Sequence, residues 1–424
     1  MHGTILLPGD KSVSHRAAMI SAMAAGTTRI DNFATSADCA STLGCVKALG
    51  VGVRREGNTV FVDGVGKTGF LAPSSRLDCG NSGTTMRLIS GILAGQNFDS
   101  VLFGDESLQG RPMKRVIAPL AKMGASIESH DGKAPLTITG KHPLNAIEYT
   151  PPVASAQIKS CVLLAGLNSD GETSVIEKVQ TRDHTERMLR WFGVDVRVEE
   201  TAGGSRISVS GDAELAARDL IVPSDISSAA FFMVAAACLD GSDILLPNVG
   251  LNPSRRAVFD VLLGLGARME LLEEAEASNE PTATIRIRGG IDGANHRGAN
   301  VLSGDIIANL IDEIPILAIM GTQIEGGLEI RDAAELRVKE SDRIAAVADN
   351  LKRMGADITE FPDGFKVERS ELTGAVIDSF GDHRIAMAFA IAGLLANGET
   401  EINGAESADV SFPRFFETLE FVVQ

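Results

Sequence analysis

The chain has 424 residues, of which 44% are hydrophobic and 22% charged, a composition typical of a folded protein with two or three domains. Its formal net charge of −17 disfavours nucleic acid and anionic membranes as general partners, because both would repel it. Aromatic residues make up only 4% of the chain, so a surface for stacking sugars or bases is not expected.

The cysteines indicate a reducing compartment. The five of them form no C-x-x-C pair and no regular framework, and each lies in or beside an apolar stretch. No apolar run approaches the roughly 20 residues of a membrane helix, and the N-terminus lacks the pattern of a secretory signal. The histidines are scattered, so a metal site is not expected. We therefore expect a cytoplasmic protein.

The first predicted element joins a polar head to a buried helix. Residues 8–26 read PGDKSVSHRAAMISAMAAG, and the run from Ala17 to Ala25 is almost entirely apolar. Lys11 and Arg16 precede this run, at the positive end of the helix dipole, which is unfavourable unless an anion lies there. For this segment alone, a solvated first turn is an equally good interpretation.

The same pattern returns five times along the chain. Each copy has a polar head, an apolar helix and a glycine beside a short strand, and the later heads begin near residues 79, 154, 224, 309 and 381. The six glycines that follow the helices recur at intervals of roughly seventy residues, which is the length of a structural unit. They are Gly26, Gly95, Gly171, Gly241, Gly326 and Gly398.

A second element lies between successive heads. It is an amphipathic helix ending in Gly-Ala or Gly-Val, followed by two strands whose side chains alternate, as in TVFVDG and RISVSG. Each unit therefore reads β-α-β-α-β-β. This element occurs five times against six heads, which suggests that the chain starts partway through a unit and that both ends belong to one lobe.

Six such units are too many for one core and predict an α/β (α+β) fold of two lobes, each with three βαβαββ units. We expect residues 1–10 and 226–424 in lobe one and residues 11–225 in lobe two. The apolar helices would form the centre of each lobe, with their heads at one end. If the lobes face each other, the heads meet in a cleft between them, where we expect the active site.

The heads and their flanks collect cations that suit small anions. Helix N-termini and Arg side chains bind phosphate and carboxylate, and this number of cations in an acidic protein suits more than one dianion. Head four, which begins at Ser224, carries no cation, so we expect it to serve packing. The candidate residues are Lys11, Ser12, Arg16, Gly80, Gly83, Arg87, Arg111, Lys114, Arg115, Ser155, Gln157, Lys159, Arg182, His184, Lys339, Arg343, Asp382, His383 and Arg384.

Two carboxylates stand among these cations. Asp312, in the segment LIDEIP, either interacts with the dipole of the following helix or acts as a general base whose pKa neighbouring Lys and Arg control. Glu340, between Lys339 and Arg343, is either half of a surface ion pair or a second proton carrier. Two such groups would allow one proton to be removed and another delivered.

Other motifs are weaker. The segment DGVGKTG resembles part of a P-loop, but Phe61 stands where the first glycine belongs. Cys79 lies beside a glycine-rich turn, where a buried thiol is a better interpretation than a nucleophile. His15, His184 and His383 lie beside arginines and are either pH-sensitive neighbours of the site or structural histidines.

Seven motifs, in this order, are similar to those of the EPSP synthase family: PGDKSVSHR, GNSGTTMR, RPMKR, SAQIKS, LIDEIP, VKESDR and GDHR. The resemblance covers essentially the whole chain. It implies the enolpyruvyl transferase fold, in which two lobes of three units each form an inside-out α/β barrel. It also implies transfer of the enolpyruvyl (carboxyvinyl) group of phosphoenolpyruvate to the 5-hydroxyl of shikimate 3-phosphate, with release of phosphate. This reaction belongs to the shikimate pathway to chorismate and aromatic amino acids and is the target of glyphosate. The resemblance implies no metal or other cofactor, and we expect a monomer.

The resemblance carries roles onto matching residues. Asp312 would accept the proton of the attacking hydroxyl, and Glu340, with Lys11, would serve protonation of the methylene carbon. The implied ligands of shikimate 3-phosphate are Lys11, Ser12, Arg16, Ser155, Gln157, Arg182, Asp312 and Lys339. The implied ligands of phosphoenolpyruvate are Lys11, Gly83, Arg111, Gln157, Arg343 and Arg384.

Three positions depart from one well-known branch of the family. Val410 stands where that branch has a lysine, Ala156 replaces a serine and Glu335 replaces an asparagine. These changes indicate a different branch and leave open which cation takes the place of the lysine. Replacement of the glycine at Gly83 by alanine accompanies glyphosate tolerance in the family, so sensitivity of this chain is plausible and unsettled.

Two other functions fit less well. The enolpyruvyl transferase that acts on UDP-N-acetylglucosamine shares the fold, but its first head reads Gly-Ala-Lys-Asn and its mobile loop usually carries a reactive cysteine. Here the head is Gly-Asp-Lys-Ser, and residues 104–115 contain no cysteine. A non-catalytic anion-binding relative would be expected to lose Asp312 or Glu340, and both are present.

Overall fold

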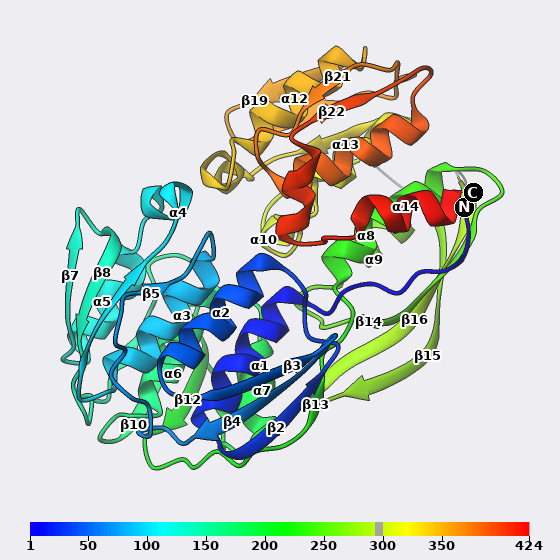
Figure 1. The fold of residues 1–424 in the computed structure, drawn as a ribbon. Coiled ribbons are helices and arrows are strands. Elements are labelled where there is room, and N and C mark those ends of the chain that lie inside the picture. Colours follow the sequence, from blue (N-terminus) through cyan, green and yellow to red (C-terminus); the bar gives the residue numbers. More distant parts are fainter. Residues whose placement is uncertain (293–299, 424) are drawn as a thin grey trace. The chain divides into compact units, whose positions relative to one another are not determined.

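The computed structural model describes residues 1–292 and 300–423, which divide into two units (Figure 1). Unit 1 comprises Met1–Pro8, Pro223–Glu276 and the residues from Pro281 onward, and unit 2 comprises Gly9–Val222 and Ala277–Glu280. Both chain ends therefore belong to unit 1. No helix among the described residues is long and apolar enough to cross a membrane.

Unit 2 contains three sheets of four strands with one topology. Each sheet has the strand order first, second, fourth, third. The short first strand pairs in parallel with the second, and the fourth strand pairs antiparallel with both the second and the third. The first sheet is β13 (Leu220–Ile221), β2 (Ala25–Asp31), β4 (Thr59–Val65) and β3 (Gly52–Glu56). The second is β5 (Leu77–Asp78), β6 (Asp99–Phe103), β8 (Lys133–Thr139) and β7 (Ser126–His130). The third is β9 (Glu148–Tyr149), β10 (Glu172–Glu177), β12 (Gly204–Ser210) and β11 (Arg197–Thr201).

Three apolar helices form the centre of unit 2: α1 (Lys11–Met23), α3 (Gly83–Ala94) and α6 (Ala156–Gly166). They are buried on nearly every side, because small and branched apolar residues occupy all faces after the first turn. The amphipathic helices α2 (Ala37–Ala48), α5 (Lys114–Lys122) and α7 (His184–Trp191) pack around them, and the short α4 (Glu106–Gly110) follows β6.

Unit 1 repeats this plan with one exception. Its complete sheets are β1 (His2–Thr4), β14 (Asp243–Gly250), β16 (Glu280–Ile291) and β15 (Ala267–Ala277), then β17 (Val301–Leu302), β18 (Leu328–Ile330), β20 (Gly364–Val367) and β19 (Ile358–Phe361). The third sheet has only β21 (Val376–Asp378) and β22 (Glu401–Asn403). The central helices are α8 (Ile226–Cys238), α11 (Ile314–Gln323) and α13 (His383–Leu395), which contact one another. Other helices are α9 (Ala257–Gly264), α10 (Ile306–Leu310), η2 (Ala334–Val338), α12 (Arg343–Arg353), η3 (Ala405–Val410) and α14 (Phe415–Val423).

The two-stranded sheet corrects the expectation of six equal units. After β22 the chain forms η3 and α14 in place of an antiparallel pair of strands. Phe412 and Phe415 from this segment pack tilted or edge-on against Phe231 and Phe232 of α8, with ring centroids 5.7–6.1 Å apart. Such aromatic contacts bury large apolar areas. The final helix therefore covers part of the core that strands cover elsewhere.

The first strand of the first sheet also comes from a distant part of the chain. The strand β13 follows the last outer helix of unit 2 and pairs in parallel with β2, while β1 pairs in parallel with β14 of unit 1. The chain therefore passes between the units at Pro8–Gly9 and at Val222–Pro223, and again on either side of the short segment Ala277–Glu280. This exchange lets a chain that begins partway through a unit still complete its sheets.

Candidate active site

The head of α1 presents a lysine and a serine. Asp10 caps the helix by accepting a hydrogen bond from the Val13 amide at 2.8 Å, which satisfies one of the free N–H groups of the first turn. Lys11 forms an ion pair of 2.9 Å with Asp38 of α2, and its side chain stays 25% exposed. Ser12 is also partly exposed. Lys11 and Ser12 thus remain accessible at a helix start, although Asp38 already neutralises part of the lysine charge.

Arg16 is placed differently from the other predicted cations. Its guanidinium is buried, and it donates from Nε to Thr185 Oγ1 at 2.7 Å and from Nη2 to Ser160 Oγ at 2.9 Å. Its Nη1 donates to the Ser12 carbonyl at 2.9 Å. Burial, together with the nearby Arg182, lowers the pKa of Arg16 to about 10. Arg16 therefore ties α1 to α6 and α7 and remains charged at neutral pH.

The heads of α3 and α6 are joined by an arginine–glutamine contact. Arg87 Nη1 donates to Gln157 Oε1 at 2.6 Å, and Gln157 Nε2 donates to Thr84 Oγ1 at 2.9 Å. Gly83, the first residue of α3, is buried beside them, and a Cβ there would lie 3.0 Å from Arg87 Nη1. Any side chain at Gly83 would therefore displace the arginine that holds Gln157.

Arg111 and Arg182 approach the helix heads from loops. Arg111 follows α4, and its Nη2 donates to Asn81 Oδ1 at 2.7 Å and to Ser107 Oγ at 3.2 Å. Arg182 lies just before α7 and is half-buried. Ser155 caps α6 by accepting from the Ile158 amide at 3.4 Å. Asn81 and Ser107 offer neutral oxygens to Arg111, and an arginine held in this way can still attract an anion.

A buried charge cluster supports the head of α6. Lys159 is 1% exposed and pairs with Glu177 at 2.7 Å and with Glu186 at 2.6 Å. Burial acts to lower the pKa of Lys159, but the two carboxylates raise it, and burial raises the pKa of Glu186. Lys159 was predicted as a candidate ligand, but in the structure it forms buried ion pairs within unit 2.

Two of the three histidines beside arginines are deeply buried in unit 2. His15 Nδ1 lies 2.6 Å from Thr42 Oγ1, which is 2.7 Å from Thr85 Oγ1, and burial lowers the pKa of His15 to about 3. His184 Nδ1 lies 2.7 Å from Glu280 Oε1, and both side chains are buried. His15 is therefore neutral over the physiological range and links the first two helix heads as a structural residue.

In unit 1 the segment before α11 carries two carboxylates in different surroundings. The Asp312 side chain is 18% exposed, whereas Glu313 is 1% exposed. Asp312 lies between two guanidinium groups, with Arg343 Nη1 at 3.5 Å from Oδ1 and Arg255 Nη1 at 3.9 Å from Oδ2. Glu313 Oε1 accepts a hydrogen bond from Ser227 and lies 3.4 Å from Arg255 Nη2 and 3.7 Å from Arg384 Nη1.

Arg343 lies at the centre of a second cluster of carboxylate side chains in unit 1. Its side chain is 1% exposed, and it pairs with Asp382 at 2.8 Å, with Glu340 at 2.8 Å and with Asp312. Burial acts to lower the pKa of Arg343, but Asp382 and Glu340 raise it, while Arg343 holds the pKa of Asp382 well below its usual range. Glu340 remains partly exposed, and Lys339 pairs with Glu335 at 3.3 Å.

The predicted residues therefore fall into one set in each unit, and the heads within each unit are brought together. Sequence reasoning missed Arg255, which nothing but its position after Asn252-Pro253 would have singled out, and it missed the buried role of Glu313. Head four was expected to serve packing, but its Ser227 also donates a hydrogen bond to Glu313. A serine is too common at helix starts to be a signal by itself.

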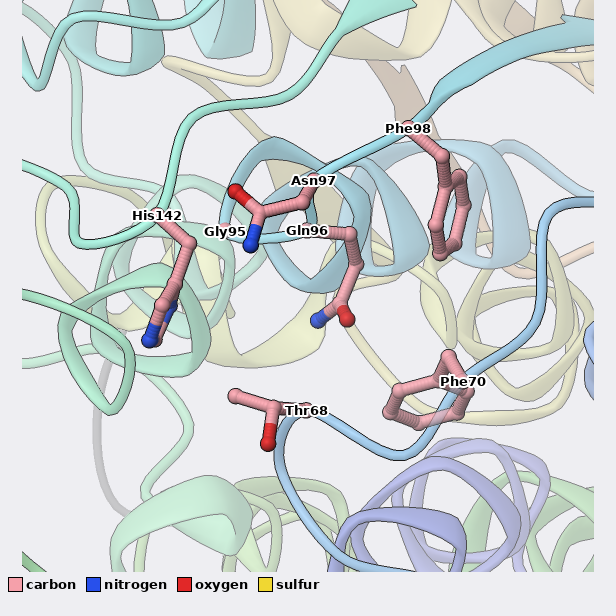
Figure 2. A pocket seen from close by; sticks show the side chains of 7 residues that line it. All are labelled: Thr68, Phe70, Gly95, Gln96, Asn97, Phe98 and His142. Carbon is pink, nitrogen blue, oxygen red and sulfur yellow. The ribbon is translucent and has the colours of Figure 1, made fainter.

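A cavity of about 100 Å³ lies elsewhere in unit 2 (Figure 2). It is near the C-terminal end of α3, away from the helix head, and is lined by Thr68, Phe70, Gly95, Gln96, Asn97, Phe98 and His142. None of these lining residues is a predicted ligand. Cys79, the candidate nucleophile, is fully buried, and the Cys45 thiol together with burial raises its pKa, so it is a structural thiol as expected.

Comparisons with known proteins agree on one family. A sequence model of EPSP synthase (3-phosphoshikimate 1-carboxyvinyltransferase) matches residues 1–419. The chain is 51% identical to a 3-phosphoshikimate 1-carboxyvinyltransferase of Solibacter usitatus and 50% identical to one of Citrifermentans bemidjiense, with 100% of this chain and 97% of each relative covered.

The fold is shared as well. The structure superposes on an EPSP synthase of Acinetobacter baumannii with a TM-score of 0.87 and 45% identity, covering 99% of this chain and 95% of that one. The predicted α/β fold with repeated units is thereby confirmed. Because the family model and the relatives span nearly the whole chain, the chain belongs to the EPSP synthase family.

Proposed function

We propose that the two sets of residues together transfer the carboxyvinyl group of phosphoenolpyruvate to the 5-hydroxyl of shikimate 3-phosphate and release phosphate. This is the reaction of the family to which the chain belongs. One observation carries the assignment of roles. Asp312 is a partly exposed carboxylate at a helix head, 3.5 Å and 3.9 Å from two buried arginines, while the cations of unit 2 lie at helix heads that suit anions.

Shikimate 3-phosphate would take its ligands mainly from unit 2. Lys11, Ser12 and Ser155 lie at helix heads, where N–H groups and the dipole favour a phosphate. Arg16 is bonded to protein partners, so it would act through its charge and through the Ser12 carbonyl that it holds. The full proposed set is Lys11, Ser12, Arg16, Ser155, Gln157, Arg182, Asp312 and Lys339.

Phosphoenolpyruvate would be bound by arginines whose planar groups match carboxylate and phosphate. Arg111 donates to the neutral side chain of Asn81, and the absence of a side chain at Gly83 leaves room beside Arg87. The full proposed set is Lys11, Gly83, Arg111, Gln157, Arg343 and Arg384. Because these residues come from both units, the reaction requires that the residue sets of unit 1 and unit 2 contact the same two substrate molecules.

The proton steps fall to the carboxylates. The 5-hydroxyl oxygen forms a bond to C2 of phosphoenolpyruvate as Asp312 takes the hydroxyl proton, and C3 gains a proton through Glu340 with Lys11. The methyl group of this tetrahedral adduct then returns a proton to the Glu340 carboxylate, which restores the C2–C3 double bond as the bond from C2 to the phosphate oxygen breaks and phosphate leaves. The arginines would stabilise the adduct more than either substrate, which is what accelerates the reaction.

The setting of the enzyme follows from composition. We propose a monomer in the cytoplasm that acts on small anions and binds neither nucleic acid nor membrane. The net charge of −17 and the free cysteines, four of them buried, support this setting.

Phosphate release tests the proposal. The purified protein is mixed with phosphoenolpyruvate and either shikimate 3-phosphate or UDP-N-acetylglucosamine. Release that depends on shikimate 3-phosphate is the expected result. Release only with the nucleotide sugar would show that the acceptor is wrong, and binding of either anion without release would show a protein that has lost the chemistry.

A further inference from the structure

A buried network in unit 1 joins three elements that no sequence motif connects. Glu313 at the start of α11, Arg255 in the loop before α9 and Ser227 in the first turn of α8 are 1%, 3% and 3% exposed. Ser227 donates to Glu313 Oε1, and Arg255 Nη2 donates to the Ser227 hydroxyl. A buried pair of charges is costly to desolvate, so its presence beside Asp312 calls for a role beyond general stability.

Arg255 is shared unequally between two neighbouring carboxylates. Its Nη2 lies 3.4 Å from Glu313 Oε1 and bonds to the serine that Glu313 holds, whereas its Nη1 lies 3.9 Å from Asp312 Oδ2. Strong pairs between Arg and carboxylate have N–O distances near 2.8 Å. Arg255 therefore lies closer to Glu313 than to Asp312, and its distance to Asp312 is longer than that of a strong pair.

The same arrangement occurs on the other side of Asp312. Arg343 lies 3.5 Å from Asp312 but only 2.8 Å from both Asp382 and Glu340. Each arginine beside Asp312 is thus bound more closely to another carboxylate. Further charged or titratable groups at these helix heads include Arg384 of α13, 3.7 Å from Glu313, His383, whose charge lowers the pKa of Asp382, and Asp225, which caps α8.

We propose that Glu313 and Arg255 are positioning residues that keep Asp312 basic. This proposal rests on the role of Asp312 as the general base in the proposed function. By binding Arg255, Glu313 prevents that guanidinium from forming a close pair with Asp312. A close pair with Arg lowers the pKa of a carboxyl group by about 1–3 units, and a carboxylate with so low a pKa is a poor proton acceptor.

The network predicts opposite effects of two charge-removing substitutions. In Glu313→Gln, Arg255 loses its main partner and turns toward Asp312, so the pKa of Asp312 falls. In Arg255→Gln, Asp312 loses a nearby cation, so its pKa rises. The double variant removes both charges, and the pKa of Asp312 should return close to that of the wild type.

The test is the pH dependence of kcat at saturating concentrations of both substrates. The acidic limb reports the group that must be deprotonated in the bound complex. We expect it to move to lower pH by about one unit in Glu313→Gln, with a lower plateau, and to higher pH by about one unit in Arg255→Gln. The double variant should lie within about 0.3 units of the wild type on the same argument.

Matched controls separate this effect from general disturbance. Arg256→Gln makes the same chemical change one residue away, where the arginine is partly exposed and pairs with Asp260 at 2.8 Å. Glu417→Gln is the matching control for Glu313→Gln, because Glu417 is exposed and pairs with Arg414. Neither control substitution should shift the acidic limb of the pH profile of kcat. If Glu313→Gln does not fold, Glu313→Asp carries the test, because its shorter side chain withdraws from Arg255 and should shift the limb downward by less.

The proposal is overturned if the acidic limb stays in place in both folded variants, or if it moves in the same direction in both. The network would then be purely structural. Asp312→Asn distinguishes this failure from failure of the proposed function. If Asp312→Asn is inactive while the limbs do not move, the base assignment stands and only the positioning role fails. If Asp312→Asn is active, the base assignment itself is wrong.

Discussion

The two units repeat one fold but bond their arginines differently. In unit 2, Arg16, Arg87 and Arg111 donate to hydroxyl, carbonyl and amide oxygens of the protein. In unit 1, Arg255, Arg343 and Arg384 approach carboxylates, which belong to Asp312, Glu313, Glu340 and Asp382. A cation that donates to neutral oxygens keeps more of its attraction for an anion than one beside a carboxylate, so we expect Arg343 and Arg384 to attract phosphoenolpyruvate less strongly than Arg111 does.

This difference suggests a division of tasks. Unit 2 presents helix starts and guanidinium groups that donate to neutral oxygens, which suits the proposed binding of anions. Unit 1 places carboxylates beside buried arginines, which suits the proposed proton transfer. The same repeated helix head can serve either purpose, because the fold determines only where the side chains lie. Substitutions in the two units should therefore change different measured quantities.

The largest effect is expected from Asp312→Asn in unit 1. The amide cannot accept the hydroxyl proton, so kcat should fall by about 10²–10⁴-fold, the usual contribution of a general base. The measurement is steady-state phosphate release at saturating substrates. A variant that keeps even a tenth of the wild-type kcat would contradict the role of this carboxylate.

Arg343→Gln should have the next largest effect, and it should act on stability. Asp382 and Glu340 would lose the cation that pairs with both, and removing one partner of a buried pair costs about 3–5 kcal/mol. Denaturant unfolding monitored by circular dichroism measures this loss. Arg353→Gln in the same helix is the control, because its pair with Asp349 is exposed and should contribute less than about 1 kcal/mol. Equal losses in the two variants would contradict the description of unit 1.

In unit 2, Arg111→Ala should impair binding without destabilising the protein. A hydrogen bond to a charged group contributes about 1.5–3 kcal/mol, so the KM for phosphoenolpyruvate should rise by about 10–100-fold while kcat changes little. The exposed Arg197 of β11 provides a control for loss of one positive charge. If Arg111→Ala lowers kcat and leaves KM unchanged, the division between the units fails.

The smallest effect is expected from His15→Asn and concerns pH. The pKa of His15 is about 3 in the folded chain and near 6.5 when unfolded, so the unfolded state binds more protons as the pH falls below 6.5. The wild type should therefore lose about 1.4 kcal/mol of stability between pH 8 and pH 5.5 through this residue. Asn can still hydrogen-bond to Thr42, so the variant should lack this part of the loss. Unfolding curves at the two pH values would contradict the argument if both proteins responded equally.

Much of the fold could be predicted from the sequence, because the repeat is carried by features that act locally. Apolar helices, their polar heads and the alternating strands recur at similar intervals, and each feature has a direct physical cause. The sequence shows five strand pairs for six heads, as the structure does, but it could not show what takes the place of the sixth pair, because Phe412 and Phe415 pack on α8 about 180 positions away. Local periodicity carries no information about such a contact.

The charged residues of the candidate site could be chosen from the sequence, but their bonding partners could not. The heads and their flanks drew attention to Lys11, Arg111, Asp312 and Arg343, because charges near the start of an apolar helix need an explanation. The sequence could not show that Glu313 is buried beside Arg255, because the two lie 58 positions apart and both types of residue are common on surfaces. It also could not show that Arg16 and Lys159 bond within the protein.

The most direct test of the division between the units is the affinity of Asp312→Asn for shikimate 3-phosphate, measured by titration calorimetry on the preparation whose turnover has been determined. Most of the proposed ligands of this substrate belong to unit 2, so the dissociation constant should stay within about threefold of the wild type, a change of less than 1 kcal/mol. Loss of affinity in parallel with loss of turnover would contradict the account, because Asp312 would then contribute much of the binding energy of this substrate and the loss of turnover would no longer isolate its role as the base.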